Sequence, residues 1–341
     1  MSAVIATKIG PWRESLQLQP SPEVTSPGSG LLKIRVLSAG LAFPDVLTVE
    51  GKHIMQREAP FVPANECAGE VTEIGPDCEE FGFSVGDVVF GSGLYGALQQ
   101  HTLLSAEHAY RLPPGVSVDV AAGFELNYGT TWHGLVDNAR LQRGEKLLVL
   151  GASGGVGMAA IDIGVALGAE VIACASSPAK LEACAAAGAT TLINYAEGDF
   201  KAALKDAGVY GDVDVVYDPV GGHVAEPAMR AMGWGGRFVV IGFAAGGATP
   251  KTAIPAFPLN LALLNERRIM GCFWGAWKAR DGNRGNRKNM HEMLRLVASG
   301  ALKPLVSKSY GLDRFADAFD DIMSRRVVGK ITIRVNEPSR L

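Results

Sequence analysis

The residues best suited to chemistry are three glycines at three-residue spacing, Gly151, Gly154 and Gly157. Glycine permits a sharp turn and a close approach of main-chain amides to a ligand, because it has no Cβ. An apolar run at residues 147–150 precedes them, as in a strand buried on both faces, and apolar residues recur at helical spacing after them. A ligand-free glycine turn is the alternative. The order strand, glycine turn, helix predicts a dinucleotide-binding unit whose helix N-terminus receives a pyrophosphate.

The runs that follow the glycines favour the dinucleotide-binding unit over an isolated turn. Apolar segments at residues 170–175, 191–195, 213–217 and 237–241 alternate with helical patterns. This alternation is typical of a doubly wound parallel sheet. We therefore expect a Rossmann-type α/β domain at residues 124–275.

The segments on either side have a different pattern. Residues 1–123 contain short alternating runs separated by Gly and Pro turns, which predict an antiparallel, β-rich unit. Residues 276–341 return to this style, with a helix at residues 287–299, a helix capped by Asp313 and a final strand at residues 330–335. A last apolar run at residues 269–274 predicts an exposed edge strand, and its pairing with a second copy would give a homodimer.

Composition excludes several classes of protein. The 341 residues are 48% hydrophobic and 20% charged with a net charge of −3, which predicts a sizeable core and disfavours nucleic acid as a partner. No apolar run has the length of a membrane span. Five widely spaced cysteines without a Cys-x-x-Cys motif indicate a reducing compartment, and we expect a cytoplasmic protein. The final Ser339-Arg340-Leu341 is close to a peroxisomal address, the alternative in a eukaryotic cell.

Five short motifs together resemble the medium-chain dehydrogenase/reductase superfamily, and within it the zinc-independent NADPH:quinone oxidoreductases, the zeta-crystallin-like branch. They lie at residues 127–130, 151–157, 218–222, 242–244 and 273–275. The resemblance implies a GroES-like substrate domain, split in sequence around the Rossmann domain. It also implies NADPH bound in a cleft between the domains, and a homodimer.

The positions that hold catalytic zinc in the alcohol dehydrogenases of this superfamily carry other residues here. The loop at residues 40–45 has no Cys or His, and the later pair reads Asn65-Glu66. Zinc prefers Cys and His ligands, so we predict no metal site.

The second strand of the dinucleotide-binding unit predicts the type of cofactor. An NAD-preferring unit usually ends this strand in Asp or Glu, which accepts hydrogen bonds from the ribose hydroxyls. Here the strand is followed by Ser176 and Ser177, and then by Lys180. Two hydroxyls and a lysine suit a 2′-phosphate, which predicts NADPH, whereas a solvated helix lysine is the alternative for Lys180. The resemblance places Tyr195 beside the same phosphate.

The resemblance also implies where the rest of the cofactor binds. The main-chain amides of the glycine turn hold the diphosphate, scattered segments surround the nicotinamide and its ribose, and a lysine near the C-terminus contacts the cofactor. For Tyr128, Phe273 and Trp274, ordinary core packing is the alternative. The expected residues are Gly154, Gly155, Val156, Gly157, Tyr128, Thr130, Gly242, Phe243, Ala244, Phe273, Trp274 and Lys330.

Departures from the family's pattern concern the substrate side. Ala42 replaces an Asn that many members carry before Phe-Pro-Asp45, and His53 replaces a Tyr that is the proposed proton donor of related enoyl-thioester reductases. A histidine titrates near neutral pH, so His53 is a candidate acid, and a surface-loop histidine is the alternative. We predict a substrate pocket formed by Ala42, Asp45, His53 and Tyr128, with His53 and Tyr128 as candidate catalytic acids.

Three functions follow from these patterns. The first is NADPH-dependent reduction of quinones or other electron-poor α,β-unsaturated carbonyls by direct hydride transfer. The second is reduction of a 2-enoyl thioester, which adds a proton at the neighbouring carbon. The third is a non-enzymatic, NADPH-binding crystallin-like or regulatory protein.

Overall fold

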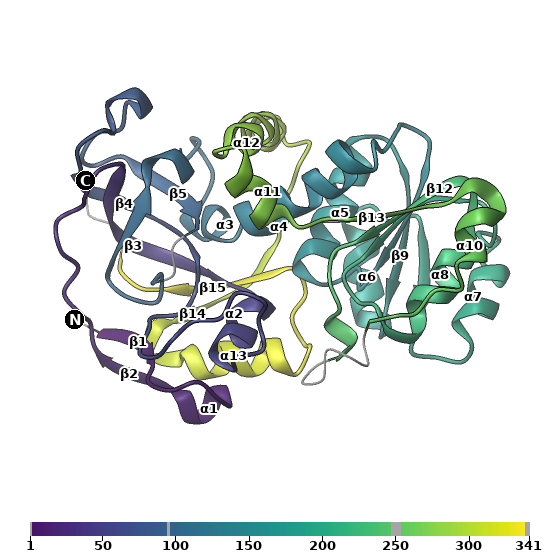
Figure 1. The fold of residues 1–341 in the computed structure, drawn as a ribbon, viewed down its shortest axis with the longest axis horizontal. Coiled ribbons are helices and arrows are strands. Elements are labelled where there is room, and N and C mark those ends of the chain that lie inside the picture. The colour runs from purple at the N-terminus through teal and green to yellow at the C-terminus, as the bar shows by residue number, and fades with distance from the viewer. Residues whose placement is uncertain (1, 94–95, 247–253, 338–341) are drawn as a thin grey trace. The chain divides into compact units, whose positions relative to one another are not determined.

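The computed structural model describes residues 2–93, 96–246 and 254–337, and the chain forms two compact units (Figure 1). The first unit consists of Met1–Leu126 and Leu305–Leu341, and the second of Asn127–Pro304. The predicted C-terminal tripeptide, residues 339–341, lies outside the described residues.

The second unit is built on a six-stranded parallel sheet in the order β10-β9-β8-β11-β12-β13. From β8 the chain adds β9 and then β10 on one side. It then returns to the middle with β11 and adds β12 and β13 on the other side, so the strand order reverses between β8 and β11. Ligands of open α/β sheets bind at the carboxyl ends of the strands beside such a reversal. The strands are β8 (Lys146–Leu150), β9 (Glu170–Ala175), β10 (Thr191–Asn194), β11 (Val213–Asp218), β12 (Met232–Val240) and β13 (Arg268–Gly271).

Helices cover both faces of this sheet. On one face, Leu148 of β8 and Phe238 of β12 form a buried cluster with Leu204 of α7 and Met229 of α8. On the other, α5 approaches so closely that a Cβ on Gly164 would lie 2.9 Å from Leu147 and 3.0 Å from Val171. Because both faces are covered, the strands are almost continuously apolar. The helices are α5 (Gly155–Ala166), α6 (Pro178–Ala186), α7 (Phe200–Asp206) and α8 (Ala225–Ala231).

The second unit also contains most of α4 (Glu125–Trp132) and the helices α10 (Asn260–Leu263), α11 (Trp274–Arg280) and α12 (Arg284–Ala298). We expected the first unit to resume at residue 276, but it resumes at Leu305. Two hydrogen bonds hold residues 274–304 in the second unit. Trp274 Nε1 donates to Asn286 Oδ1 at 3.0 Å, which joins α11 to α12. The Lys303 amide then donates to Asp162 Oδ2 of α5 at 2.8 Å, which holds the end of this segment in the second unit.

The first unit contains a largely antiparallel seven-stranded sheet, in the order β14-β15-β3-β4-β5-β7 with β6 pairing β3. A separate antiparallel pair, β1 with β2, lies in the same unit. The sequence pattern does not indicate β1, β2, β7 or β14, because these strands are short or half-exposed. The strands are β1 (Ser2–Ala6), β2 (Leu16–Pro20), β3 (Leu31–Leu41), β4 (Glu66–Ile74), β5 (Val88–Ser92), β6 (His101–Ser105), β7 (Ala109–Arg111), β14 (Val306–Gly311) and β15 (Lys330–Arg334).

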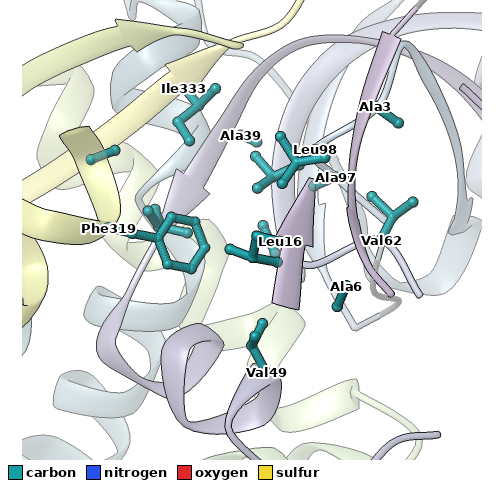
Figure 2. Packing of buried hydrophobic residues seen from close by; sticks show 14 of the residues in the cluster. Ala3, Ala6, Leu16, Ala39, Val49, Val62, Ala97, Leu98, Phe319 and Ile333 are labelled. Atoms are coloured by element: carbon teal, nitrogen blue, oxygen red, sulfur yellow. The ribbon is translucent and has the colours of Figure 1, made fainter. Parts of the chain in front are cut away.

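One core of the first unit joins segments from both ends of the chain. Figure 2 shows Phe319 of the C-terminal helix beside Leu16 of β2, with Leu98 and Ile333 in the same cluster. Burial of apolar side chains is the dominant favourable term in folding, so this cluster ties the two ends of the chain together. The helices here are α1 (Trp12–Ser15), α2 (Phe43–Val49), α3 (Val118–Ala122) and α13 (Phe315–Met323).

The expected fold class, a Rossmann-type parallel sheet with a GroES-like β-rich unit, is confirmed. One local prediction is wrong: Asp313 lies within a 3-10 turn, Leu312–Arg314, and the N-cap of α13 is Arg314 without a side-chain cap bond. The turn inserts before the helix, so the expected cap falls one residue too early. None of the helices in the described ranges is both long and apolar enough to cross a membrane.

Candidate functional site

The glycine turn between β8 and α5 is shaped by close packing. Gly151 has a φ of +57°, a conformation that favours glycine. A Cβ on Gly157 would lie 2.6 Å from the carbonyl oxygen of Ala152, and one on Gly155 would lie 2.5 Å from Asn127 Nδ2. Gly151 and Gly157 are therefore needed by the turn itself, and Gly155 lies against the Asn127 side chain.

Gly154 differs from its neighbours. A Cβ there would meet nothing closer than the Gly151 carbonyl oxygen at 3.4 Å, an ordinary contact. Its own amide donates to that oxygen at 3.0 Å, so it is engaged within the turn. Helix geometry leaves the amides of Gly155, Val156 and Gly157, in the first turn of α5, without intrahelical acceptors. These three amides, rather than the four we expected, are the donors suited to a diphosphate.

The residues after β9 form a polar group at the carboxyl end of that strand. Lys180 Nζ lies 3.2 Å from Ser176 Oγ, as donor to the hydroxyl, and Ser177 is the N-cap of α6. Tyr195 is held beside them, because its amide donates to the Ala175 carbonyl at 3.1 Å. The sequence analysis predicted these residues around one phosphate. Because β9 and β10 pair in parallel, the segments that follow the two strands lie at the same end of the sheet.

The loops after β11 and β12 are joined to each other through Asp218. Its Oδ1 accepts the amides of Val220 and Gly221, each at 2.8 Å, and its carbonyl accepts the Ile241 amide at 2.9 Å. Burial raises the pKa of Asp218 to about 6. The expected Gly242, Phe243 and Ala244 follow directly, at the carboxyl end of β12, and Phe243 is exposed.

The two aromatic residues expected at the cofactor, Phe273 and Trp274, differ in their exposure to solvent. Phe273 is 56% exposed, whereas Trp274 is buried. The Trp274 ring packs so closely on Gly129 that a Cβ there would lie 2.9 Å from it. The Thr130 carbonyl accepts the thiol of Cys272 at 3.4 Å. Trp274 is thus a core residue, the alternative considered above, and a role in cofactor contact is not supported for it.

Tyr128 is likewise packed inside the second unit. Its hydroxyl donates to Asp162 Oδ2 at 2.6 Å. Burial, followed by the charge of Asp162, raises the pKa of Tyr128 well above its ordinary value of 10.0. A phenol that already donates to a carboxylate gives up its proton poorly, so this geometry disfavours Tyr128 as a catalytic acid.

The first unit holds a buried cluster of three charged residues, which we name the Asp45 cluster: Asp45 of α2, Glu66 of β4 and Lys330 of β15. Lys330 Nζ donates to Glu66 Oε1, and both side chains are almost completely buried. Glu66 Oε2 accepts the Leu126 amide at 3.1 Å, and Asp45 Oδ2 accepts the Ala42 amide at 2.8 Å. Lys330, expected to contact the cofactor, is therefore engaged by a carboxylate of its own unit.

The other predicted substrate-side residues lie around α2. Ala42 is its N-cap, and His53 follows it in a loop, where His53 Nδ1 accepts the Met55 amide at 3.2 Å. Asn65, next to Glu66, has its side-chain Oδ1 buried without a hydrogen-bond partner among the described residues. A buried acceptor of this kind is costly unless a donor meets it.

The side chains at residues 65–67, the position at which alcohol dehydrogenases hold zinc, do not fit a zinc site. Glu66 is paired with Lys330, and burial raises the pKa of the neighbouring Cys67 thiol to about 12, which keeps it protonated. Zinc favours thiolate and neutral imidazole ligands, and Asn65 offers neither. Residues 2–93, 96–246 and 254–337 contain no group of three His, Cys, Asp or Glu arranged to hold a metal ion.

Sequence reasoning missed three residues that shape these sites. Asp162 lies mid-helix in an apolar pattern, and its charge was the available signal, because a buried aspartate needs partners. Asn127 was quoted only as part of a motif. Glu66 was considered only as a metal-position residue, and its pairing with Lys330, 264 positions away in sequence, leaves no trace in local pattern.

Comparison with known proteins identifies the family. Over 313 residues the chain is 33% identical to quinone oxidoreductase-like protein 2 homolog of Nematostella vectensis, covering 91% of this chain and 83% of that protein. The chain belongs to the medium-chain dehydrogenase/reductase superfamily, in its quinone oxidoreductase branch. It is an oxidoreductase. Two family models match it, "Alcohol dehydrogenase GroES-like domain" at residues 28–114 and "Zinc-binding dehydrogenase" at residues 155–299.

Other known proteins resemble the chain over nearly its whole length. The spectinabilin polyketide synthase system protein NorB of Streptomyces orinoci is 35% identical over 94% of this chain, which spans 14% of that protein. The quinone oxidoreductase of Thermus thermophilus, solved also in complex with NADPH, is 26% identical with a TM-score of 0.82, covering 98% of this chain and 100% of that one. The CurK enoyl reductase is 26% identical with a TM-score of 0.85, covering 98% and 99%.

Proposed function

We propose that the chain is an NADPH-dependent reductase of quinones or other electron-poor α,β-unsaturated carbonyls, acting by hydride transfer without a catalytic zinc. The observation that carries the cofactor assignment is the 3.2 Å contact of Lys180 Nζ with Ser176 Oγ after β9. The contact gathers a cation and a hydroxyl where an NAD-specific unit would have a carboxylate. The similarity to quinone oxidoreductases supports the substrate class.

Different segments of the chain bind different parts of NADPH. The amides of Gly155, Val156 and Gly157 bind the diphosphate, helped by the dipole of the 12-residue helix α5. Lys180 and the two serines bind the 2′-phosphate, with Tyr195 beside them. The ring end is bordered by Thr130, Gly242, Phe243, Ala244 and Phe273.

NADPH, when bound, supplies a hydride from its nicotinamide ring. The protein's contribution is to orient the acceptor and exclude water, and it requires no covalent step. Residues 65–67, at the position where alcohol dehydrogenases hold zinc, do not suit that metal. This agrees with the proposed reaction, because reduction of a quinone needs no metal to stabilise an alkoxide.

A second candidate, reduction of a 2-enoyl thioester, is favoured by the similarity to polyketide synthase proteins and to the CurK enoyl reductase. Reduction there adds a proton to carbon next to the thioester carbonyl. The predicted acid His53 lies in the loop after α2, and its Nδ1 bond to Met55 leaves Nε2 to carry a proton.

The deciding experiment compares acceptors. Purified protein is mixed with NADPH or NADH and with 9,10-phenanthrenequinone or a crotonyl thioester, and nicotinamide absorbance is followed. Faster turnover of the quinone with NADPH supports the first candidate. Faster turnover of the thioester supports the second, and tight NADPH binding without turnover of any acceptor contradicts both.

We also propose a homodimer through the edge of the parallel sheet. Strand β13 lies at one edge, pairs only with β12 in the ladder, and carries Ile269 with 45% of its surface exposed. An exposed edge strand presents unpaired main-chain groups with which a strand of a second copy can pair.

A further inference from the structure

The loop after β11, residues 219–222, lies against the glycine turn of the same unit. A Cβ on Gly151 would lie 2.7 Å from Val220 Cγ2 and 3.7 Å from Pro219 Cγ, so these side chains fill the space beside the turn. Strands β8 and β11 are neighbours in the sheet, and the strand order reverses between them. The loop therefore lies where an open α/β sheet binds its ligand.

Two main-chain hydrogen bonds join this loop to the segment that follows β12. The Pro219 carbonyl accepts the Ala244 amide at 3.1 Å, and the Val220 carbonyl accepts the Ala245 amide at 2.9 Å. The contact is close, because a Cβ on Gly222 would lie only 2.9 Å from Ala245 Cβ. The loop thus holds the segment that is predicted to border the nicotinamide.

Asp218 holds both the loop and the segment after β12. Its Oδ1 accepts the amides of Val220 and Gly221, each at 2.8 Å. Its main-chain carbonyl accepts the amides of Ile241 and Gly242, at 2.9 and 3.3 Å. The side chain of this one residue therefore fixes the loop, while its main chain fixes the start of the next segment.

The Asp218 side chain is only 1% exposed. Burial raises its pKa to about 6, and the amides of Gly221 and Val220 partly offset this effect, so Asp218 is a carboxylate above neutral pH. An ionised group removed from water is costly unless it is hydrogen-bonded, and a charged acceptor forms stronger hydrogen bonds than a neutral one. The charge on Asp218 and the loop conformation that points two amides at it consequently stabilise each other.

We propose that Asp218 is a positioning residue for the cofactor: it holds residues 219–222 so that the glycine turn and the segment after β12 keep the places in which they bind NADPH. The inference rests on the proposed function. Asp218 acts through the loop and not by touching the cofactor. The diphosphate and the nicotinamide are common to NADPH and NADH, so loss of Asp218 should weaken both cofactors to the same extent. Lys180, by contrast, acts on the 2′-phosphate alone.

The first test measures binding without turnover. The Kd values for NADPH and NADH are determined by calorimetry at about pH 8, where Asp218 of the natural protein is ionised. Asp218→Ala leaves two loop amides without their acceptor, and we expect both Kd values to rise roughly 10-fold. Asp218→Asn retains an oxygen that can accept from the same two amides. It should restore both Kd values to within about threefold of those of the natural protein.

A matched control separates positioning from a general loss of stability. Arg237 lies towards the amino ends of the strands, where its Nε donates to the Ala139 carbonyl at 3.1 Å and its Nη2 donates to Glu145 at 2.5 Å. Arg237→Met removes these bonds from the same sheet at a distance from the loop. We expect it to lower stability in urea unfolding and to leave both Kd values unchanged.

A second variant carries the test if Asp218→Ala does not fold. Gly222→Ala leaves Asp218 intact and places a Cβ 2.9 Å from Ala245 Cβ, which pushes the loop and the segment after β12 apart. We expect it to weaken NADPH and NADH equally as well.

Three results overturn the inference. The first is an unchanged affinity for both cofactors in whichever of Asp218→Ala and Gly222→Ala folds, and the second is a weakening of NADPH alone. The third is an Asp218→Asn protein that binds no better than Asp218→Ala, or an Arg237→Met protein that is weakened as much. Failure of the natural protein to bind either nucleotide would instead contradict the proposed function.

Discussion

The hydroxyl of Tyr128 donates a 2.6 Å hydrogen bond to Asp162 Oδ2, the same oxygen that accepts the Lys303 amide at 2.8 Å. One buried carboxylate oxygen thus links α4 (Glu125–Trp132), α5 and the segment that leaves α12. Burial raises the pKa of Asp162, while Tyr128 and the Lys303 amide lower it. The pair is a structural junction of the second unit.

Replacing Tyr128 tests this structural role. Tyr128→Phe leaves Asp162 short of one donor in a buried setting, so we expect the free energy of unfolding to fall by about 1–3 kcal/mol. Urea unfolding measures this change. Tyr210→Phe is the matched control, because the ring that lies under Lys205 is retained, and we expect a change within about 0.5 kcal/mol. A stable Tyr128→Phe protein whose only defect is a slower reaction and a lost alkaline limb in the pH–rate profile would restore Tyr128 as the acid.

The site after β9 predicts a selective effect on the two cofactors. Lys180→Ala removes the cation beside Ser176, and a charged hydrogen bond is worth about 1.5–3 kcal/mol. We expect the Kd for NADPH to rise roughly 10- to 100-fold and the Kd for NADH to change little, as measured by calorimetry. Lys201→Ala, on the exposed surface of α7, should change neither constant. Equal weakening of both cofactors would remove the 2′-phosphate assignment.

The glycine turn offers a matched pair of substitutions. Gly157→Ala places a Cβ 2.6 Å from the Ala152 carbonyl oxygen, so we expect it to destabilise the unit or prevent its folding. Gly154→Ala meets ordinary contacts and has a φ of −75°, so it should fold with unchanged stability. It should still weaken NADPH binding, because the added methyl group lies at the N-terminus of α5, where the phosphates are expected. Thermal unfolding and NADPH titration separate the two effects, and unchanged NADPH affinity in Gly154→Ala would place the diphosphate elsewhere.

Asp45 makes a prediction about stability as a function of pH. Its pKa is raised from 3.8 to about 7 in the folded protein, so the folded state holds its proton over a range in which the unfolded state has lost it. The stabilisation is complete below the unfolded pKa and is lost as pH rises through the folded one. The natural protein should therefore lose more stability between pH 4 and about 7 than Asp45→Asn does. Urea unfolding at several pH values gives both curves, and parallel curves would show that Asp45 titrates normally.

The edge strands of the parallel sheet test the proposed dimer. Ile269→Lys puts a charge on β13, and we expect it to convert a dimer to a monomer in sedimentation velocity. Leu192→Lys is the matched control on β10, the opposite edge of the same sheet, where Leu192 is 41% exposed. Dissociation by Leu192→Lys instead would move the interface to the other edge.

The sequence by itself determined the parallel sheet, its glycine turn and the absence of an acid after β9. These features are local: apolar runs, glycine spacing and the residues that end a strand appear in consecutive positions. The same locality explains why Lys180 and Ser176, four residues apart, were placed together correctly.

Tertiary structure decided the roles of side chains whose partners are remote in the chain. Tyr128 faces Asp162, Trp274 faces Gly129, and Lys330 faces Glu66, pairings that no local pattern encodes. The extension of the second unit to Pro304 was decided in the same way, by hydrogen bonds between distant segments. The state of a buried ionisable group depends on which charges and amides surround it in three dimensions, and for Asp45 those neighbours come from two other strands of the fold and from the N-cap of its own helix.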